Sequence, residues 1–164
     1  MKGKNNRSLP VLWAPWRRKY ILRGVKEKNC VFCTTHSQKR DKQNFIVRRR
    51  AYAFALLNLY PYNNGHLMIC PNRHVGRFET LSEKELVDIM RLQNEMLALL
   101  QKRMKPHGFN VGVNLGRAAG AGVVGHLHIH VVPRWIGDTN FMPMIGKTKV
   151  ISESLSSVYA RLLG

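Results

Sequence analysis

Acidic residues and cysteines are both scarce in this sequence. Its 164 residues hold 9 Asp and Glu against 27 Lys and Arg, so the formal net charge is +18 at pH 7. Such a surplus favours polyanionic partners, nucleotides or nucleic acid, without choosing between them. Three cysteines cannot build a disulfide framework, and two of them, Cys30 and Cys33, have the Cys-x-x-Cys spacing of half a metal site.

Long apolar runs are also missing. No segment approaches the roughly 20 apolar residues that cross a bilayer, and the basic N-terminus leads into Trp and Pro instead of an apolar signal core. We therefore expect a cytoplasmic protein that makes no membrane contact. Without internal repeats or linkers to divide the chain, we expect a basic and aromatic arm over residues 1–24 and a single domain over 25–164.

The segment 125–135, GHLHIHVVPRW, carries the densest cluster of titratable side chains. Because successive side chains of a strand point to opposite faces, His126, His128 and His130 are predicted to line one face. The apolar residues between them would line the other. An imidazole acts near neutral pH as a nucleophile, a proton donor or acceptor, or a metal ligand, so this row is the candidate reactive centre.

A loop of small residues, NLGRAAGAG at 114–122, precedes the histidine row. Its glycines allow backbone N–H groups to approach an anion closely. A histidine that attacks phosphorus needs such donors for the phosphate oxygens. Loop and row together predict phosphate chemistry, with the N–H groups of Gly120, Ala121 and Gly122 as the cradle.

Short apolar runs and one long periodic segment predict an α+β fold. A capping box from Ser82 to Glu85 begins a helix that runs to about Arg103, with Leu and Met at helical spacing. A second helix is expected at 152–163, a solvated turn at 48–50 and a polar surface loop at 36–44. The expected architecture is a five-stranded antiparallel sheet with one long helix and a C-terminal helix. Its strands are predicted at 45–47, 51–57, 66–71, 109–114 and over the histidine row.

The histidine row also resembles a known signature. His-x-His-x-His-Val-Val-Pro at 126–133 is similar to the motif of the histidine triad (HIT) superfamily of nucleotide hydrolases and transferases. Segments 53–58 and 65–71 resemble that family's first conserved segment, and Arg73-His74 follows as in its zinc-containing members. The resemblance implies the HIT-like fold, which agrees with the sheet expected above.

A narrower resemblance points to one branch of that superfamily. LWAPW at 12–16, LNLYPYN at 57–63, Asn-x-Gly at 114–116 and PRWIGDTNF at 133–141 are similar to the bacterial diadenosine tetraphosphate phosphorylase branch. The resemblance implies phosphorolysis of purine dinucleoside polyphosphates through a nucleotidyl-histidine intermediate.

Each matching position takes a role from the family. His128 would be the nucleophile that attacks the α-phosphorus, and His130 would hydrogen-bond the scissile phosphate. His126 would lie near the leaving group, with His66 as the fourth, supporting histidine. Three further residues would bind substrate: Asn58 at the ribose, Asn114 beside the phosphates, and Trp135, which would otherwise lie near a dimer boundary.

A closed zinc site needs two ligands besides Cys30 and Cys33, and the sequence offers His74 and one member of the histidine row. In the family's zinc members that fourth ligand is the position of His126. The resemblance thus implies a structural Zn²⁺, no organic cofactor, and a homodimer whose two sheets join edge to edge.

The acceptor that completes the reaction stays open. Family hydrolases carry Gly-Gln-Ser/Thr, and phosphorylases Gly-Ser, near positions 121–123, where this chain has Ala-Gly-Val. One alternative is therefore a HIT-family nucleotide hydrolase or nucleoside phosphoramidase that uses water. Another is a zinc-stabilised nucleic-acid-binding protein that uses the positive charge and the N-terminal aromatics, in which case binding would be nonspecific.

Overall fold

The computed structural model describes residues 30–138 and 151–164. The predicted arm over 1–24 and the last residues of the 133–141 segment lie outside these residues. Among the helices of the described residues, none has the length and apolar character needed to cross a membrane.

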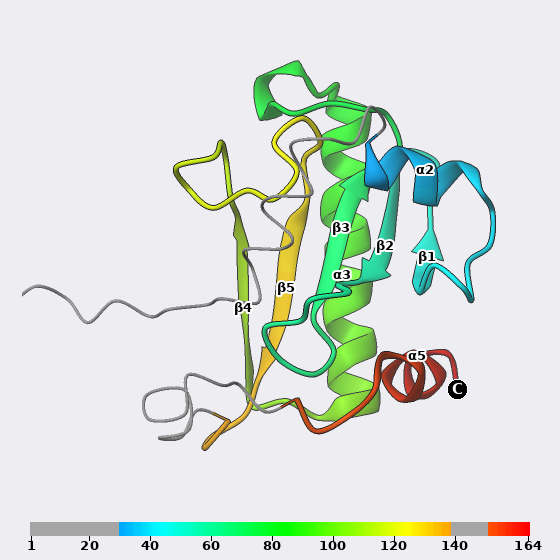
Figure 1. The fold of residues 1–164 in the computed structure, drawn as a ribbon, viewed down its shortest axis with the longest axis vertical. Helices are drawn as coiled ribbons and strands as arrows, with labels where there is room; N and C mark the ends of the chain where they lie inside the picture. The colour runs from blue at the N-terminus through cyan, green and yellow to red at the C-terminus, as the bar shows by residue number, and fades with distance from the viewer. Residues whose placement is uncertain (1–29, 139–150) are drawn as a thin grey trace, which may run out of the picture.

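A single five-stranded antiparallel sheet forms the centre of the molecule (Figure 1). Its strands lie side by side in the order β1-β2-β3-β5-β4, so β1 and β4 are the two edges. The register places Met68 of β3 opposite His130 of β5, and Gly112 of β4 on the other side of the same histidine. The strands are β1 (Ile46–Arg49), β2 (Ala53–Leu57), β3 (Leu67–Pro71), β4 (Gly108–Val113) and β5 (Ile129–Arg134).

The long helix α3 (Glu83–Met104) covers one face of this sheet. Ser82 and Glu85 form the predicted capping box, in which each side chain accepts a hydrogen bond from the other residue's backbone N–H. Lys105 adopts a left-handed conformation with φ 48°, which ends the helix. The C-terminal helix α5 (Leu155–Leu163) packs on α3 and β1, so the predicted α+β architecture is confirmed.

Alternation along the strands separates the core into two clusters. The larger one lies between the sheet and α3 and includes Leu127, Ile129 and Val131, the apolar residues of the histidine row. The smaller one lies on the opposite face, where the short helix α2 (Val31–Ser37) places Phe32 against Phe54 and its neighbours. The imidazoles of the row therefore face the α2 side, as the period of two predicts.

Several boundaries differ from the prediction. Only His130 of the row lies inside β5, since His126 and His128 precede its first residue. The helix α2 is absent from the sequence prediction, and α5 begins at Leu155, later than the expected 152.

The arginine triplet is not the solvated turn that was predicted. Arg49 belongs to β1 and binds Asp41 at 2.9 Å, while Arg50 donates to Asp88 at 2.6 Å and also pairs with Glu95. These arginines fasten the end of β1 to a surface loop and to α3.

Candidate active site and metal site

A backbone carbonyl fixes the tautomer of His128. The Nδ1 of this buried imidazole lies 2.9 Å from the carbonyl oxygen of His126, which can only accept, so Nδ1 carries the proton. A neutral imidazole has one N–H, and the lone pair of His128 is consequently on Nε2. That atom is the nucleophilic position of the ring.

His66 determines which ring nitrogen of His130 carries the proton. The backbone N–H of Tyr62 donates to His66 Nδ1 at 3.0 Å, so the proton of neutral His66 is on Nε2. His66 Nε2 lies 2.9 Å from His130 Nδ1 and donates to it, which places the proton of neutral His130 on Nε2. The rings of His128 and His130 are 5.0 Å apart between centroids. A lone pair on one residue and an N–H on the next are the two groups needed to attack a phosphorus atom and to hydrogen-bond its oxygens.

Burial favours the neutral forms of His126 and His128. Desolvation lowers the pKa of His128 and outweighs the opposing effect of its hydrogen bond to the His126 carbonyl. Desolvation also lowers the pKa of His126 to about 4, helped by the positive charge that His74, His128 and His36 would carry. A neutral imidazole with a free Nε2 lone pair is the reactive form of a histidine nucleophile.

The four predicted metal ligands come together at the end of α2. The ligand atoms of Cys30, Cys33, His74 and His126 all lie within 4.8 Å of one another. His126 Nδ1 is 3.3 Å from the Cys30 sulfur and 3.5 Å from the Cys33 sulfur, and His74 Nδ1 is 3.4 Å from the latter. His126 Nδ1 thus faces the two cysteines, and the predicted place of His126 near the leaving group stays a prediction.

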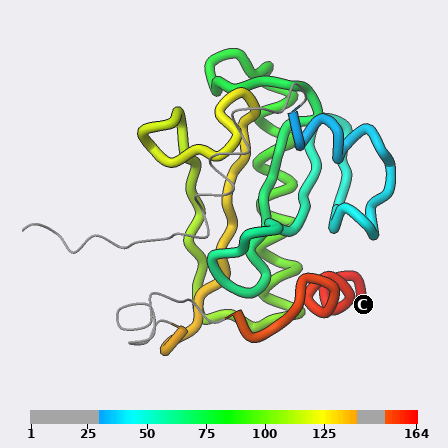
Figure 2. The backbone as a smooth tube through the Cα atoms, viewed as in Figure 1, coloured from blue at the N-terminus to red at the C-terminus, as the bar shows by residue number. Residues whose placement is uncertain are grey.

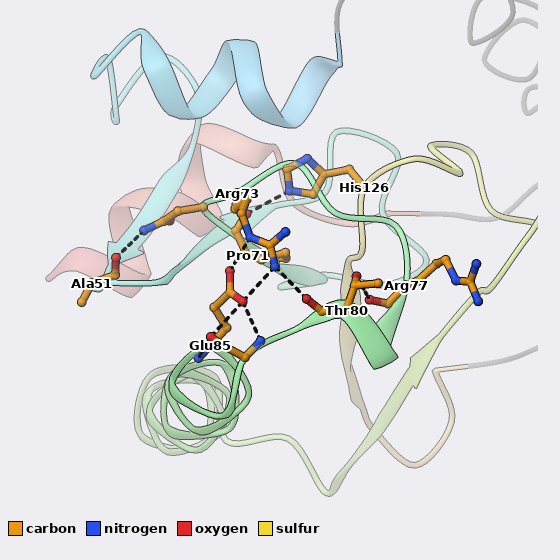
Figure 3. Close-up of polar contacts among 9 residues, drawn as sticks. Ala51, Pro71, Arg73, Arg77, Thr80, Glu85 and His126 are labelled. Carbon is orange, nitrogen blue, oxygen red and sulfur yellow. Dashed lines mark hydrogen bonds and ion pairs between the residues drawn. The ribbon is translucent and has the colours of Figure 1, made fainter.

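Hydrogen bonds outside the four-residue cluster orient its two histidines. His126 Nε2–H donates to the Pro71 carbonyl at 2.9 Å, which leaves the Nδ1 lone pair directed at the cysteines (Figure 3). The segment that carries His74 is tied to α3, because Arg73 binds both carboxylate oxygens of Glu85 and the Thr80 carbonyl. The cluster is therefore built from the N-terminal end of α2, the segment after β3 and the segment before β5.

The small-residue loop rises at the same end of the sheet as α2 (Figure 2). Gly116 and Gly120 have φ of +77° and +87°, a backbone conformation that glycine adopts without strain. The N–H of Gly120 donates to the Arg117 carbonyl and that of Ala121 to the Gly116 carbonyl. The loop's own turns thus engage the N–H groups of Gly120 and Ala121, and phosphate binding by these two residues and Gly122 stays a prediction.

Three predicted substrate residues have different surroundings. Asn58 is buried, its amide oxygen accepts from the Tyr60 N–H at 2.9 Å, and its amide nitrogen lies 3.4 Å from His66 Nδ1. Asn114 is half-buried at the start of the loop. Trp135 is partly buried and packs against the larger core cluster, and its contact with substrate stays a prediction.

Sequence reasoning did not assign a role to Asn63 or Asp138. The buried Asn63 amide donates to the Pro133 carbonyl at 3.0 Å and to Asp138 at 2.7 Å, and Asp138 also binds Arg134 through both oxygens. This network joins the loop of Tyr62 to the end of β5 and so supports the His66 pair. In the sequence, Asn63 appears only as the last residue of LNLYPYN, and Asp138 only within PRWIGDTNF after the triad.

Comparisons with known proteins agree with this arrangement. The model of the HIT domain family matches residues 39–135. The AP-4-A phosphorylase of Mycobacterium tuberculosis is 39% identical over 154 residues, which cover 90% of this chain and 79% of that protein. A bis(5'-adenosyl)-triphosphatase of Dictyostelium discoideum is 31% identical over 93 residues, 57% of this chain and 62% of the relative.

A solved structure shares the fold. The Zn-bound histidine triad family protein from Mycobacterium smegmatis superposes with a TM-score of 0.67 at 20% identity, and the match covers 82% of this chain and 91% of that one.

Proposed function

From the premise that this chain belongs to the HIT domain family, we propose that it cleaves dinucleoside polyphosphates through a nucleotidyl intermediate on His128. The single observation that carries this proposal is the hydrogen bond between His128 Nδ1 and the His126 carbonyl, which leaves Nε2 with its lone pair. The relatives named AP-4-A phosphorylase and bis(5'-adenosyl)-triphosphatase support the substrate class.

In the first half-reaction the Nε2 lone pair of His128 attacks the α-phosphorus. The N–P bond forms as the bond to the bridging oxygen breaks, and the remaining nucleoside polyphosphate leaves with that electron pair. The Nε2–H of His130, fixed by the His66 pair, hydrogen-bonds the oxygens of the phosphorus centre as their charge grows. A polyphosphate is a good leaving group, so no strong acid is required at its oxygen.

In the second half-reaction an acceptor oxygen attacks the same phosphorus and the electron pair of the N–P bond returns to Nε2. Inorganic phosphate as the acceptor gives ADP and ATP from diadenosine tetraphosphate, while water gives AMP and ATP. The 39% identity to a phosphorylase favours phosphate.

Product analysis tests the acceptor. The purified protein is incubated with diadenosine tetraphosphate with and without inorganic phosphate, and the products are resolved by chromatography. We expect ADP and ATP in the presence of phosphate and no turnover without it. AMP and ATP in both samples would make the protein a hydrolase, and no turnover in either, combined with steeply salt-dependent RNA binding, would favour the nucleic-acid-binding alternative.

We further propose that the cysteine and histidine cluster binds a structural Zn²⁺. Tetrahedral zinc with bonds of about 2.0–2.3 Å separates its ligand atoms by roughly 3.3–3.8 Å, and the sulfur–nitrogen distances of 3.3, 3.4 and 3.5 Å lie in that range. Four protein ligands would close the coordination sphere, so the ion would fasten α2 to the sheet and supply no open position for chemistry.

Finally, we propose a homodimer formed through β4. This strand is an edge of the sheet, and Val111 at its centre is 45% exposed. A long edge with exposed apolar side chains is a ready surface for pairing with a second chain.

A further inference from the structure

Phe32 stands between the metal cluster and the catalytic row. It lies in α2 between Cys30 and Cys33, and only 3% of its surface is exposed. Its ring centroid is 5.3 Å from that of His126 and 5.1 Å from that of His128. One aromatic side chain thus contacts both a metal ligand and the proposed nucleophile.

The two ends of α2 are held in different ways. At its C-terminal end the Arg49 guanidinium donates to the His36 carbonyl, and Asn44 donates to the Thr35 carbonyl. At its N-terminal end Cys30 is the N-cap without a side-chain capping bond. A helix of seven residues has little stability of its own, so its position depends on such anchors.

The N-terminal anchor of α2 is the cysteine and histidine cluster itself. Cys30 and Cys33 flank Phe32 and reach His126 and His74 across the interface with the sheet. When these four residues share a metal ion, the turn of helix that bears Phe32 is fixed against the segment before β5. Without the ion, the packing of Phe32 in the smaller core cluster remains at that end, but the four ligands are joined only by weak thiol and imidazole contacts.

The ring of His128 needs a support on its flank. A single hydrogen bond through Nδ1 leaves an imidazole free to swing about that bond, and a nucleophile must be held within about 0.5 Å of its productive position. Phe32 contacts one side of the His128 ring with an interplanar angle of 42°, and His130 meets it from another direction at 72°. Phe32 is therefore placed to restrict the swing.

We propose that Phe32 is a positioning residue that couples the metal cluster to the orientation of the His128 ring. Metal bound at the cluster holds α2, α2 holds Phe32, and Phe32 holds His128 with Nε2 facing the substrate. The catalytic consequence rests on the proposed function, whereas the orientation of His128 can be observed without any substrate.

The test compares two Phe-to-Leu substitutions in the smaller core cluster, each made in the full chain. Phe32→Leu removes the ring beside His128, and Phe54→Leu removes an equally buried ring that instead contacts His36. Each variant is assayed for bound zinc by elemental analysis, for thermal stability, for the histidine ring NMR signals, and for kcat and KM with diadenosine tetraphosphate.

We expect Phe32→Leu to keep its zinc, to shift or broaden the His128 ring signals, and to lower kcat about 10-fold to 100-fold with KM changed less than about twofold. Phe54→Leu should change the His128 signals and kcat much less than Phe32→Leu does, because it keeps the ring that contacts His128. Equal His128 signals in both variants would overturn the proposal. If the wild type does not turn the substrate over, the proposed function fails and the NMR comparison still decides this inference.

Metal removal supplies the second arm and does not depend on the folding of a variant. Chelation of zinc from the wild type should displace the His128 signals in the same direction as Phe32→Leu. Chelation of Phe32→Leu should add little, because the coupling is already broken. Unchanged His128 signals in the metal-free wild type would show that the cluster and His128 are independent. The same would follow if chelation shifted the His128 signals of Phe32→Leu as much as it shifts those of the wild type.

Discussion

At the scale of single residues, the chemistry depends on which ring nitrogen holds each proton. The His126 carbonyl fixes the tautomer of His128, and the Tyr62 N–H fixes that of His66 and thereby that of His130. The His126 carbonyl and the Tyr62 N–H are backbone groups, and His66 lies outside the 126–133 motif. The order of imidazole protons is thus a property of the local backbone.

Changing His66 tests this relay. His66→Phe keeps an aromatic ring but removes the donor to His130, so we expect kcat to fall by about 100-fold, a typical value for a positioned proton donor. His66→Gln retains an amide N–H that can reach His130 and should recover part of the loss. Steady-state kinetics measure both variants, with the exposed His107→Asn as the control. Equal activity of His66→Phe and wild type would contradict the relay.

The sequence predicted which face of the sheet each histidine lines, but it did not predict which groups hydrogen-bond in the site. Alternation places His128 and His130 opposite Leu127 and Ile129 in sequence and structure alike. The engagement of the Gly120 and Ala121 N–H groups inside their own loop depends on the turn that the loop adopts. Such local hydrogen bonds are decided by backbone angles, which the small-residue composition leaves open.

At the scale of elements, the Arg73 and Glu85 ion pair joins the start of α3 to the segment that carries His74. This hydrogen-bonded arginine, together with the Ser82 N–H, lowers the pKa of Glu85 to about 2 from its ordinary 4.5. A carboxyl whose pKa is lower in the folded state stabilises the fold above pH 4.5, and that stabilisation is lost as the pH falls toward 2.

Glu85→Gln should remove this pH dependence. We expect the variant to be less stable than wild type at pH 7, with the difference shrinking toward pH 3, as measured by urea unfolding at both values. Glu83→Gln is the matched control, since it lies in the same first helical turn and has no ion pair among the described residues. An equal loss at pH 7 in both variants would show that the negative charge matters only to the helix terminus.

The short helix α2 shows where element prediction fails. Its seven residues carry too little apolar periodicity to indicate a helix, and its anchors, Arg49 and the histidine ligands, come from distant segments. The long helix α3, with its capping box and regular Leu and Met positions, needed no such help and ends one residue from its predicted boundary.

Cysteine substitution tests the metal cluster that anchors α2. We expect Cys33→Ser to lose its bound zinc and to unfold at a lower temperature, because a closed tetrahedral site tolerates no missing ligand. Cys70→Ala should retain the metal, since this fully buried cysteine belongs to the core and not to the four-residue cluster. Zinc per chain by elemental analysis decides the matter; full occupancy in Cys33→Ser would contradict the assignment.

At the scale of the whole molecule, the fold and the family were predictable because several motifs keep their order along one chain. The resemblance to histidine triad proteins and their diadenosine tetraphosphate phosphorylase branch is confirmed by the comparisons. The ion pairs of Arg50 with Asp88 and Glu95 were not predictable, since the partners lie 38 and 45 residues away and meet only after the sheet packs on α3.

The dimer proposed through β4 is tested with a charge on its edge. Val111→Glu places a like charge from each chain at the paired strands, so we expect a monomer where the wild type is a dimer, as measured by sedimentation. Val87→Glu adds the same charge at an exposed position on α3 and should remain dimeric. A monomeric wild type, or two variants that behave alike, would contradict the proposed interface.

The central claim is that His128 carries the nucleotide during turnover, and trapping that intermediate tests it most directly. Enzyme mixed with diadenosine tetraphosphate in the absence of phosphate is quenched in base, digested and analysed by mass spectrometry. We expect one adenylyl group on the peptide that contains residue 128, located on His128 and missing in His128→Ala. An adduct on another residue, or steady turnover by His128→Ala, would contradict the account.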